Sequence, residues 1–416
     1  MKIKELKARE ILDSLGRPTI EAEVFLADGS QGIASIPSGM VQGKYEAREL
    51  RDKDPARFDG WGVLKAVEQI NQTIAPKIIG RDAAYQAKID AFLLELDGTA
   101  DSSRLGANTL LAVSQAVLEA SAFSYQLPIY AYLQAKYGLN DKNLLPTPIF
   151  NMINGGQHGA GNLDFQEFHL IPSQRQDYPR ALECGQKVYQ TLKNVLIRRG
   201  SSYSIGDEGG FTPNLFNNLD ALEILTEAVG ITNYQLGRDV FFGLDVAAAS
   251  FYQNGEYLIK DRVQPFSQKE MIKYYFDLNS QYPLFSLEDP LQEDDWSGWI
   301  ELTSQMAKDT LIIADDLVGG AKRRIQKAIK KKAANAVSLK LGQRATIGEL
   351  VEAASLSRRA GWKVIISHRS GETNDDFLAD LAVGLGADYV KFGPPARGER
   401  IVKYNRLAKI DVNLKK

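Results

Sequence analysis

A repeat in the second half of the chain is the feature that most constrains the fold. Short apolar runs such as LFSLE and VIISH each end in an ionisable residue, and helical stretches such as 348–361 lie between them. After a first interval of 43 residues, the run ends are 27, 25, 28 and 23 residues apart. They are Asp245, Glu288, Asp315, Lys340, His368 and Lys391. Strand–helix units of this length predict a parallel sheet, and so many of them predict a (β/α)8 TIM-type barrel, whose active site lies at the C-terminal strand ends.

The first half of the chain lacks this repeat and indicates an α+β domain. Residues 20–26 alternate apolar and polar side chains for most of their length, as a half-buried strand does, and a turn leads to a second strand at 31–37. Helical stretches are expected at 62–78, 84–95 and 108–122. The segment GLNDKNLLPTP, residues 138–148, indicates a linker. We therefore predict an α+β N-terminal cap domain, residues 1–138, and a catalytic barrel domain, residues 139–416.

Composition and charge exclude several classes of protein. A formal net charge of -2 over 416 residues does not suggest a nucleic-acid partner. No run approaches the roughly 18 apolar residues of a membrane span, and the start has no signal-peptide core. The single cysteine, Cys184, excludes an internal disulfide framework and fits a reducing compartment. We expect a cytoplasmic protein.

Three carboxylates, Asp245, Glu288 and Asp315, end consecutive units of the repeat. At one barrel mouth they would repel one another, which favours a hard divalent cation with oxygen ligands, Mg²⁺ above all. The simpler role for an acid after a strand is to cap the next helix. We assign that role to the neighbours Asp289 and Asp316, and predict a metal site from the other three.

Two lysines, Lys340 and Lys391, end the sixth and eighth strands by this count. A lysine beside a metal and a second lysine should have a lowered pKa and could act as a base; the alternative is a surface lysine at a strand end. In SHRSG, Arg369 and Ser370 follow His368, and arginine with serine suits a phosphate or carboxylate clamp.

Three loop segments carry further candidates, although each taken alone is more simply a turn. They are DFQEF with Gln166 and Glu167, IGDEGG with Asp207 and Glu208, and NGGQHGAGN with His158. Two of the three histidines in the chain, His158 and His368, thus fall in candidate site segments. The basic run at 322–332 is expected to be a solvated helix face.

The stretch PSGMVQG, residues 37–43, contains no ionisable side chain between Gly39 and Gly43. Glycines at both ends suit a mobile loop, because they tolerate backbone angles that other residues avoid. The residues alone leave three readings open: a lid that works through its backbone, a lid that has lost its chemistry, or a plain turn.

Taken together, these segments resemble the enolase family. The matching motifs are REILDS, GDEGGF, SLEDPLQEDDW, ADDL, SHRSGET and DLAVGLGA, in the family's order, and the resemblance runs from about residue 3 to 410. It implies an α+β cap domain followed by a modified TIM barrel. It also implies the reversible dehydration of 2-phosphoglycerate to phosphoenolpyruvate in glycolysis, for which sites of this superfamily use a lysine or histidine base with one or two Mg²⁺ ions.

The resemblance assigns a role to each candidate. Lys340 would remove the C2 proton, and Glu208, helped by Glu167, would protonate the departing C3 hydroxyl. The first Mg²⁺ would be held by Asp245, Glu288 and Asp315. Substrate would be bound by His158, Gln166, Glu167, His368, Arg369, Ser370 and Lys391, with Arg369 and Ser370 on the phosphate and Lys391 at the carboxylate end.

The lid loop departs from the family pattern Ser-Gly-Ala-Ser-Thr-Gly. Ser38, Gly39 and Gly43 are kept, but Val41 stands where the family's second serine binds a second Mg²⁺ through its hydroxyl and carbonyl. The resemblance therefore implies a lid with one metal ligand reduced to a carbonyl. Other departures near the site are Gly342, Arg344, Phe392, the turn 318–321, and Leu15, which replaces an arginine that helps to pair subunits in the family.

The family resemblance also implies a homo-oligomer built on a dimer. An alternative is a weakly active or inactive paralogue displayed on the cell surface, where Lys415 and Lys416 would bind plasminogen. Against it, every proton-transfer and first-metal residue is present, and an inactive scaffold would not need them. A superfamily member acting on a different acid is a third reading, but the SHRSG clamp argues against it.

Overall fold

The computed structural model describes residues 1–39, 42–139, 145–159 and 163–415. The predictions for Val41, for Lys416 and for the side chain of His158 lie outside this described part. Among the described residues, no helix is both long and apolar enough to cross a membrane.

The N-terminal cap is built on a three-stranded antiparallel sheet. Its strands are β1 (Ile3–Leu12), β2 (Pro18–Leu26) and β3 (Gln31–Ser35). Helix α4 (Ala107–Ser124) packs on β2 and β3 and is buried over nearly its whole length. Gly32 allows this approach, because a Cβ there would lie 2.1 Å from the Ala116 carbonyl oxygen. The predicted strands and the predicted helix at 108–122 are confirmed.

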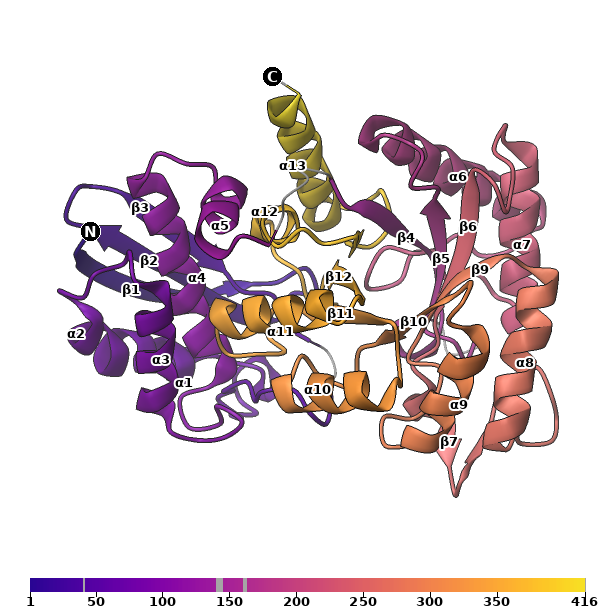
Figure 1. The fold of residues 1–416 in the computed structure, drawn as a ribbon, viewed down its shortest axis with the longest axis horizontal. Helices are drawn as coiled ribbons and strands as arrows, with labels where there is room; N and C mark the ends of the chain where they lie inside the picture. The colour runs from indigo at the N-terminus through magenta and orange to yellow at the C-terminus, as the bar shows by residue number, and fades with distance from the viewer. Residues whose placement is uncertain (40–41, 140–144, 160–162, 416) are drawn as a thin grey trace.

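The other α-helices described in the cap pack on β1 or on α4. They are α1 (Leu64–Glu68), α2 (Ala75–Ile78), α3 (Gln86–Asp97) and α5 (Ile129–Tyr137). The helix expected over 62–78 contains a π-helical segment, Gln69–Ile74, between α1 and α2. Figure 1 shows the cap at one end of the molecule, where α3 contacts α11 (Ile347–Arg359) and α5 contacts α12 (Phe377–Gly384) of the barrel.

The second half forms the predicted closed barrel of eight strands. In chain order they are β4 (Thr147–Asn154), β5 (Glu167–Pro172), β6 (Val240–Asp245), β9 (Leu284–Glu288), β10 (Leu311–Ala314), β11 (Ala336–Lys340), β12 (Lys363–Ser367) and β13 (Tyr389–Lys391). From β6 to β13 and on to β4 the pairs are parallel, as the repeat predicts. The barrel centre is filled by apolar side chains, including Ile149, Ile313 and Tyr389.

Strand β5 departs from the parallel pattern, because it runs antiparallel to both β4 and β6. The described residues between β4 and β5 contain no helix of crossover length, and antiparallel neighbours need none. Two helices, α6 (Tyr178–Arg198) and α7 (Asn218–Ile231), then lead to β6. The long first interval of the repeat holds the hairpin β7 (Tyr252–Gln253) and β8 (Glu256–Tyr257), followed by α8 (Gln268–Gln281).

Three more helices complete the outer layer: α9 (Trp296–Met306), α10 (Lys322–Lys331) and α13 (Gly398–Leu414). In α10 only Ile325 and Ala328 are buried, so the basic run is the solvated helix face that we expected. Because β4 already begins at Thr147, the last residues of the predicted linker belong to the barrel. We propose that the domain boundary lies at 138–139, just after α5.

Candidate active site

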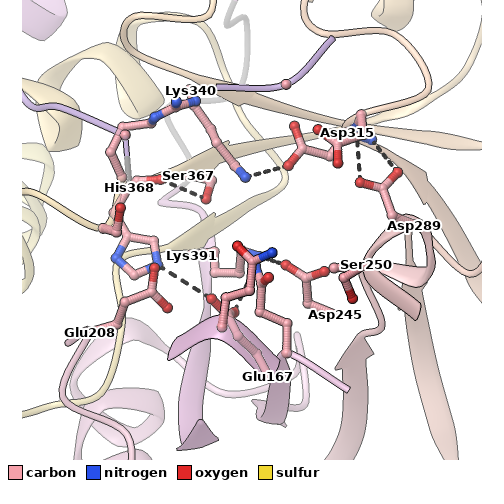
Figure 2. A pocket seen from close by; sticks show the side chains of 18 of the residues that line it. Glu167, Glu208, Asp245, Ser250, Asp289, Asp315, Lys340, Ser367, His368 and Lys391 are labelled. Atoms are coloured by element: carbon pink, nitrogen blue, oxygen red, sulfur yellow. Dashed lines mark hydrogen bonds and ion pairs between the residues drawn. The ribbon is translucent and has the colours of Figure 1, made fainter. Parts of the chain in front are cut away.

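A cavity of about 270 Å³ opens at the C-terminal ends of the barrel strands. Figure 2 shows side chains from separate strands converging on it. Its walls include most of the residues predicted for the site: Gly39, Gly43, Gln166, Glu167, Glu208, Asp245, Asp315, Lys340, His368, Arg369, Ser370 and Lys391. Glu288 is buried at the end of β9, beside Asp245 in the sheet register. Ser38 is buried next to Gly39.

Lys391 lies at the centre of the carboxylates and is only 1% exposed. Its Nζ is 2.8 Å from Asp245 Oδ2, 2.8 Å from Glu288 Oε2 and 3.2 Å from Glu167 Oε2. Burial disfavours the ammonium, but these carboxylates outweigh burial and raise the pKa of Lys391 well above its usual value. The lysine is therefore a fixed cation rather than a base.

Lys340 ends β11 and forms an ion pair with Asp315. Gln343 braces the pair, since its Nε2 donates to Asp315 Oδ1 at 2.5 Å while its Oε1 accepts from the Lys340 backbone N–H at 2.9 Å. Burial disfavours the charged lysine, but the charges of Asp315, Glu288 and Asp245 together outweigh burial and raise the pKa of Lys340. We expected a lowered pKa for a lysine beside a bound metal ion, and for the metal-bound site that expectation stays a prediction.

Glu167 and Glu208 form a buried carboxyl pair on the opposite side of the cavity from Lys340 (Figure 2). Burial and the neighbouring Glu167 charge raise the pKa of Glu208 well above its usual value. Burial would also raise the pKa of Glu167, but Lys391 and His169 outweigh it and hold that pKa well below its usual value. The two carboxyls share a hydrogen bond, so the pair presents one ionised and one protonated group.

His169 belongs to this site, and the sequence analysis missed it. Its Nε2 is 2.6 Å from Glu167 Oε2, and both side chains are buried. The two residues are i and i+2 on β5, so they point to the same face of the strand. That spacing could have identified His169 once Glu167 was placed on a strand rather than in a turn.

Asp289 and Asp316 do not cap helices, so that assignment was wrong. Helix α9 is capped by Asp295, and α10 has no side-chain cap. Asp289 instead has a positive φ of 43° and turns its carboxylate back to accept from the backbone N–H groups of Asp315 at 3.2 Å and Asp316 at 2.8 Å. Both residues line the cavity, and carboxylate oxygens of Asp289, Asp315 and Asp316 lie within 4.8 Å of one another, close enough to hold a cation.

The predicted metal ligands carry a further signal for a cation. Glu288 Oε1 is buried and contacts no hydrogen-bond donor among the described residues. Burial raises the pKa of Glu288 to about 8. The Lys391 charge acts in the opposite direction, and the charges of Asp245 and Asp315 add to the effect of burial. A buried carboxylate with an unsatisfied oxygen, next to Asp245 and Asp315, suits a hard divalent ion.

Arg369 of the predicted clamp is held by Glu46, a residue that the sequence analysis did not select. Both Oε atoms of Glu46 accept from the guanidinium, at 2.8 and 2.9 Å, and both side chains are buried. Gly39 is required beside them, because a Cβ there would lie 2.1 Å from Arg369 Nη2. At the other end of the lid, a Cβ on Gly43 would lie 2.8 Å from Asp316 Oδ1. Both lid glycines therefore serve close approach to site residues, which argues against a plain turn.

The base of the lid is tied to SHRSG by backbone hydrogen bonds. Ser38 N donates to Gly371 O at 2.7 Å, and Gly371 N donates to Ser38 O at 2.9 Å. The Ser38 hydroxyl donates to the buried carboxylate of Asp13, which lies in the REILDS motif. The cap thus supplies one wall of a site whose reactive groups come from the barrel.

Two departures from the family pattern, Arg344 and the turn 318–321, meet at Tyr45, just after the lid. Arg344 donates to the Tyr45 carbonyl oxygen at 3.3 Å, and Gly319 has a positive φ of 52° and leaves no room for a Cβ against the Tyr45 backbone. The Arg324 guanidinium lies 3.3 Å from the Tyr45 ring centroid, and Asp294 accepts from the Tyr45 hydroxyl at 2.5 Å. These contacts fix the residues that follow the lid to the barrel.

An α+β cap over a modified barrel, with lysines and a carboxyl pair around an acidic cavity, defines a class of barrel enzymes that handle protons next to anionic groups. Residues 3–133 match the family model described as "Enolase, N-terminal domain", and residues 142–416 match "Enolase, C-terminal TIM barrel domain". A curated relative, "Enolase" of Acidothermus cellulolyticus, is 46% identical over 412 residues, which cover 99% of this chain and 94% of the relative.

The chain therefore belongs to the enolase family, and its enzyme class is that of a lyase, phosphopyruvate hydratase. The predictions of family, fold class and enzyme class are confirmed.

Proposed function

We propose that this protein catalyses the reversible, Mg²⁺-dependent dehydration of 2-phosphoglycerate to phosphoenolpyruvate, as the glycolytic enzyme of the cytoplasm. The observation that carries the proposal is one cavity with Lys340 on one side and the Glu167–Glu208 pair on the other (Figure 2). Removal of a proton from C2 and loss of the C3 hydroxyl need a base and an acid, and this cavity offers one on each side. Steady-state formation of phosphoenolpyruvate from 2-phosphoglycerate, with and without Mg²⁺, tests it.

Asp245, Glu288 and Asp315 are the proposed holders of the first Mg²⁺. The unpartnered Glu288 Oε1 and the crowding of buried carboxylates support this set. Asp289 would orient Asp315, because its carboxylate accepts hydrogen bonds from the backbone N–H groups of Asp315 and Asp316. When bound, the ion supplies positive charge against the extra negative charge that develops on the substrate carboxylate.

Lys340 must be neutral to accept the C2 proton. The Asp315 charge raises the pKa of Lys340. A cation bound to Asp315 would offset that charge and lower the pKa of the lysine, so that its neutral form could act as a base. Lys391 stays charged among its carboxylates and would hold the carboxylate end of the substrate. The lysine expected to titrate is therefore Lys340 alone.

Glu208 is the proposed acid for the C3 hydroxyl, because its carboxyl is the one that holds a proton. Arg369 and Ser370 would bind the phosphate, and Arg369 would then exchange its bond to Glu46 for one to the phosphate oxygens. Gln166, His368 and His158 are the remaining proposed contacts to substrate.

Val41→Ser is expected to lower the Mg²⁺ concentration needed for full activity and to raise turnover, with less effect on substrate affinity. Mg²⁺ prefers near-octahedral oxygen coordination and can keep several waters, so valine should weaken the second ion without expelling the first. Lid closure completes that second site, and serine would return a hydroxyl ligand to it. Mg²⁺ titrations at saturating 2-phosphoglycerate measure the effect.

Val41→Ala is the matched control, because it removes the branched side chain but adds no oxygen. Superimposable titrations for the parent, Val41→Ala and Val41→Ser would contradict the proposed second-metal defect. The lid would then work through its backbone alone.

We also propose a homo-oligomer built on a dimer, and we expect Leu15→Arg to tighten it only slightly. An exposed ion pair contributes about 0 to 1 kcal/mol, so the missing arginine should weaken the pairing of caps without abolishing it. Sedimentation velocity at micromolar concentration should show the parent and the variant as dimers or multiples of dimers. A parent that sediments only as a monomer would refute the proposal.

The alternative surface role depends on the C-terminal lysines alone. Lys415 is exposed but forms an ion pair with Asp411 at 2.5 Å. Deletion of the two terminal lysines separates the two roles, since it should remove plasminogen binding in the alternative and leave dehydration of 2-phosphoglycerate unchanged in ours.

A further inference from the structure

Arg400 of α13 lies directly behind the SHRSG segment and is fully buried, with 0% of its side chain exposed. Its Nη1 is 2.6 Å from His368 Nδ1 and 2.8 Å from the carbonyl oxygen of Arg369, and its Nη2 is 2.8 Å from that of Ser370. The carboxylate that pairs with it, Glu399, is 3.6 Å from Nε. One guanidinium therefore contacts three consecutive residues of the proposed substrate site.

The contact with His368 determines where the imidazole carries its proton. A guanidinium has donors and no acceptor, so His368 Nδ1 must accept, and the proton of the neutral ring must be on Nε2. His368 is buried and lines the cavity. Its Nε2 lies 4.0 Å from Glu167 Oε1, beyond hydrogen-bond distance, and has no hydrogen-bond partner among the described residues.

We propose that Arg400 is a positioning residue that locks His368 as a neutral hydrogen-bond donor, with its Nε2–H directed into the cavity for an acceptor oxygen of the bound substrate. The consequence for catalysis rests on the proposed function. Locked in this way, the imidazole cannot serve as a base, because its second nitrogen is already engaged.

The fold is arranged to keep Arg400 in place. Gly393 has a φ of 95°, and a Cβ added to it would lie 3.1 Å from Arg400 Cδ. A larger residue at position 393 would therefore crowd the Arg400 side chain. One turn further along α13, Lys403 donates to Thr373 O at 3.0 Å and pairs with Glu372 at 2.7 Å. Helix α13 thus holds the whole 368–373 segment from behind. Burying a guanidinium costs free energy. The hydrogen bonds from Arg400 to three acceptors of one site segment explain why a charged side chain is buried here.

The first test reads the tautomer directly in the intact protein. The chain has three histidines, so ¹⁵N-histidine labelling gives three imidazole spin systems, and His368→Gln identifies the one from His368. We expect that ring to carry its proton on Nε2 with an unprotonated Nδ1 at neutral pH. A proton on Nδ1, or on both nitrogens, would overturn the proposal, whether or not the protein turns over 2-phosphoglycerate.

The second test uses Arg400→Lys, which keeps a charge but cannot contact three acceptors with a fixed fork. We expect kcat to fall about 10- to 100-fold, as for other residues that orient a site side chain, with a smaller change in KM and with loss of the single His368 tautomer. Arg406→Lys is the control, because Arg406 lies on the same helix and pairs with Asp380 outside the cavity. It should leave both readouts unchanged.

The double variant separates positioning from general destabilisation. If Arg400 acts through His368, Arg400→Lys with His368→Gln should lose less activity than the product of the single losses. Fully multiplicative losses, or an Arg400→Lys protein with parental kcat and an unchanged tautomer, would refute the proposal. Should Arg400→Lys fail to fold, the tautomer of the parent protein still decides. A parent without 2-phosphoglycerate turnover but with the Nε2–H tautomer would overturn the proposed function and support the positioning role.

Discussion

Lys340→Ala is expected to abolish both phosphoenolpyruvate formation and exchange of the C2 proton of 2-phosphoglycerate with solvent. A general base contributes about 10² to 10⁴ in rate, and kcat should fall by the upper part of that range. Lys391 cannot take over, because three carboxylates lie within 3.2 Å of its Nζ and hold it as a cation. Steady-state assay and NMR detection of C2 deuterium incorporation measure the two effects.

The control for this variant is Lys363→Ala. Lys363 begins β12 at the opposite end of the barrel and pairs with Asp388 at 2.8 Å, so its loss should leave turnover and exchange unchanged. Persistent exchange in Lys340→Ala would show that another group removes the proton and that the assigned base is wrong.

Glu208→Gln is expected to uncouple the two half-reactions. Glutamine keeps the size of the side chain and an oxygen that can accept from Asn151 and Asn154. It cannot deliver a proton to the departing hydroxyl. Dehydration should fall by about 10² to 10⁴, while C2 exchange, which depends on Lys340, should continue. The same deuterium-incorporation experiment gives the result.

Asp207→Asn is the matched control, since Asp207 precedes Glu208 in the same loop but is not among the residues that line the cavity. It should leave both steps intact. Equal loss of exchange and dehydration in Glu208→Gln would instead place Glu208 in substrate binding or in proton removal, and would contradict its role as the acid.

The spacing of strand ends was sufficient to predict the barrel and most of its mouth. A parallel strand–helix unit places one strand end per unit at the same face, so Asp245, Asp315, Lys340 and Lys391 could be brought together from their positions alone. The same rule could not predict that β5 runs antiparallel. That strand lies before the repeat begins, and it pairs antiparallel with β4 without needing a crossover helix.

The pKa values of these groups depend on the tertiary structure alone. The pKa of Lys340 depends on its contact with Asp315, and burial of Glu208 against Glu167 decides which carboxyl of that pair holds the proton. Such effects depend on distance and on exclusion of water, and neither is encoded in spacing along the chain.

Sequence motifs carried the family resemblance, and residue types with their intervals determined the barrel and its strand-end chemistry, because a strand–helix repeat is a local pattern. Partners remote in sequence or placed by unusual backbone angles came only from the folded chain. Glu46 and Arg369 are 323 positions apart, Arg400 reaches His368 from the last helix, and Asp289 serves Asp315 through a positive φ. Only packing brings such groups within hydrogen-bond distance, since no local pattern records which distant segments a fold will place side by side.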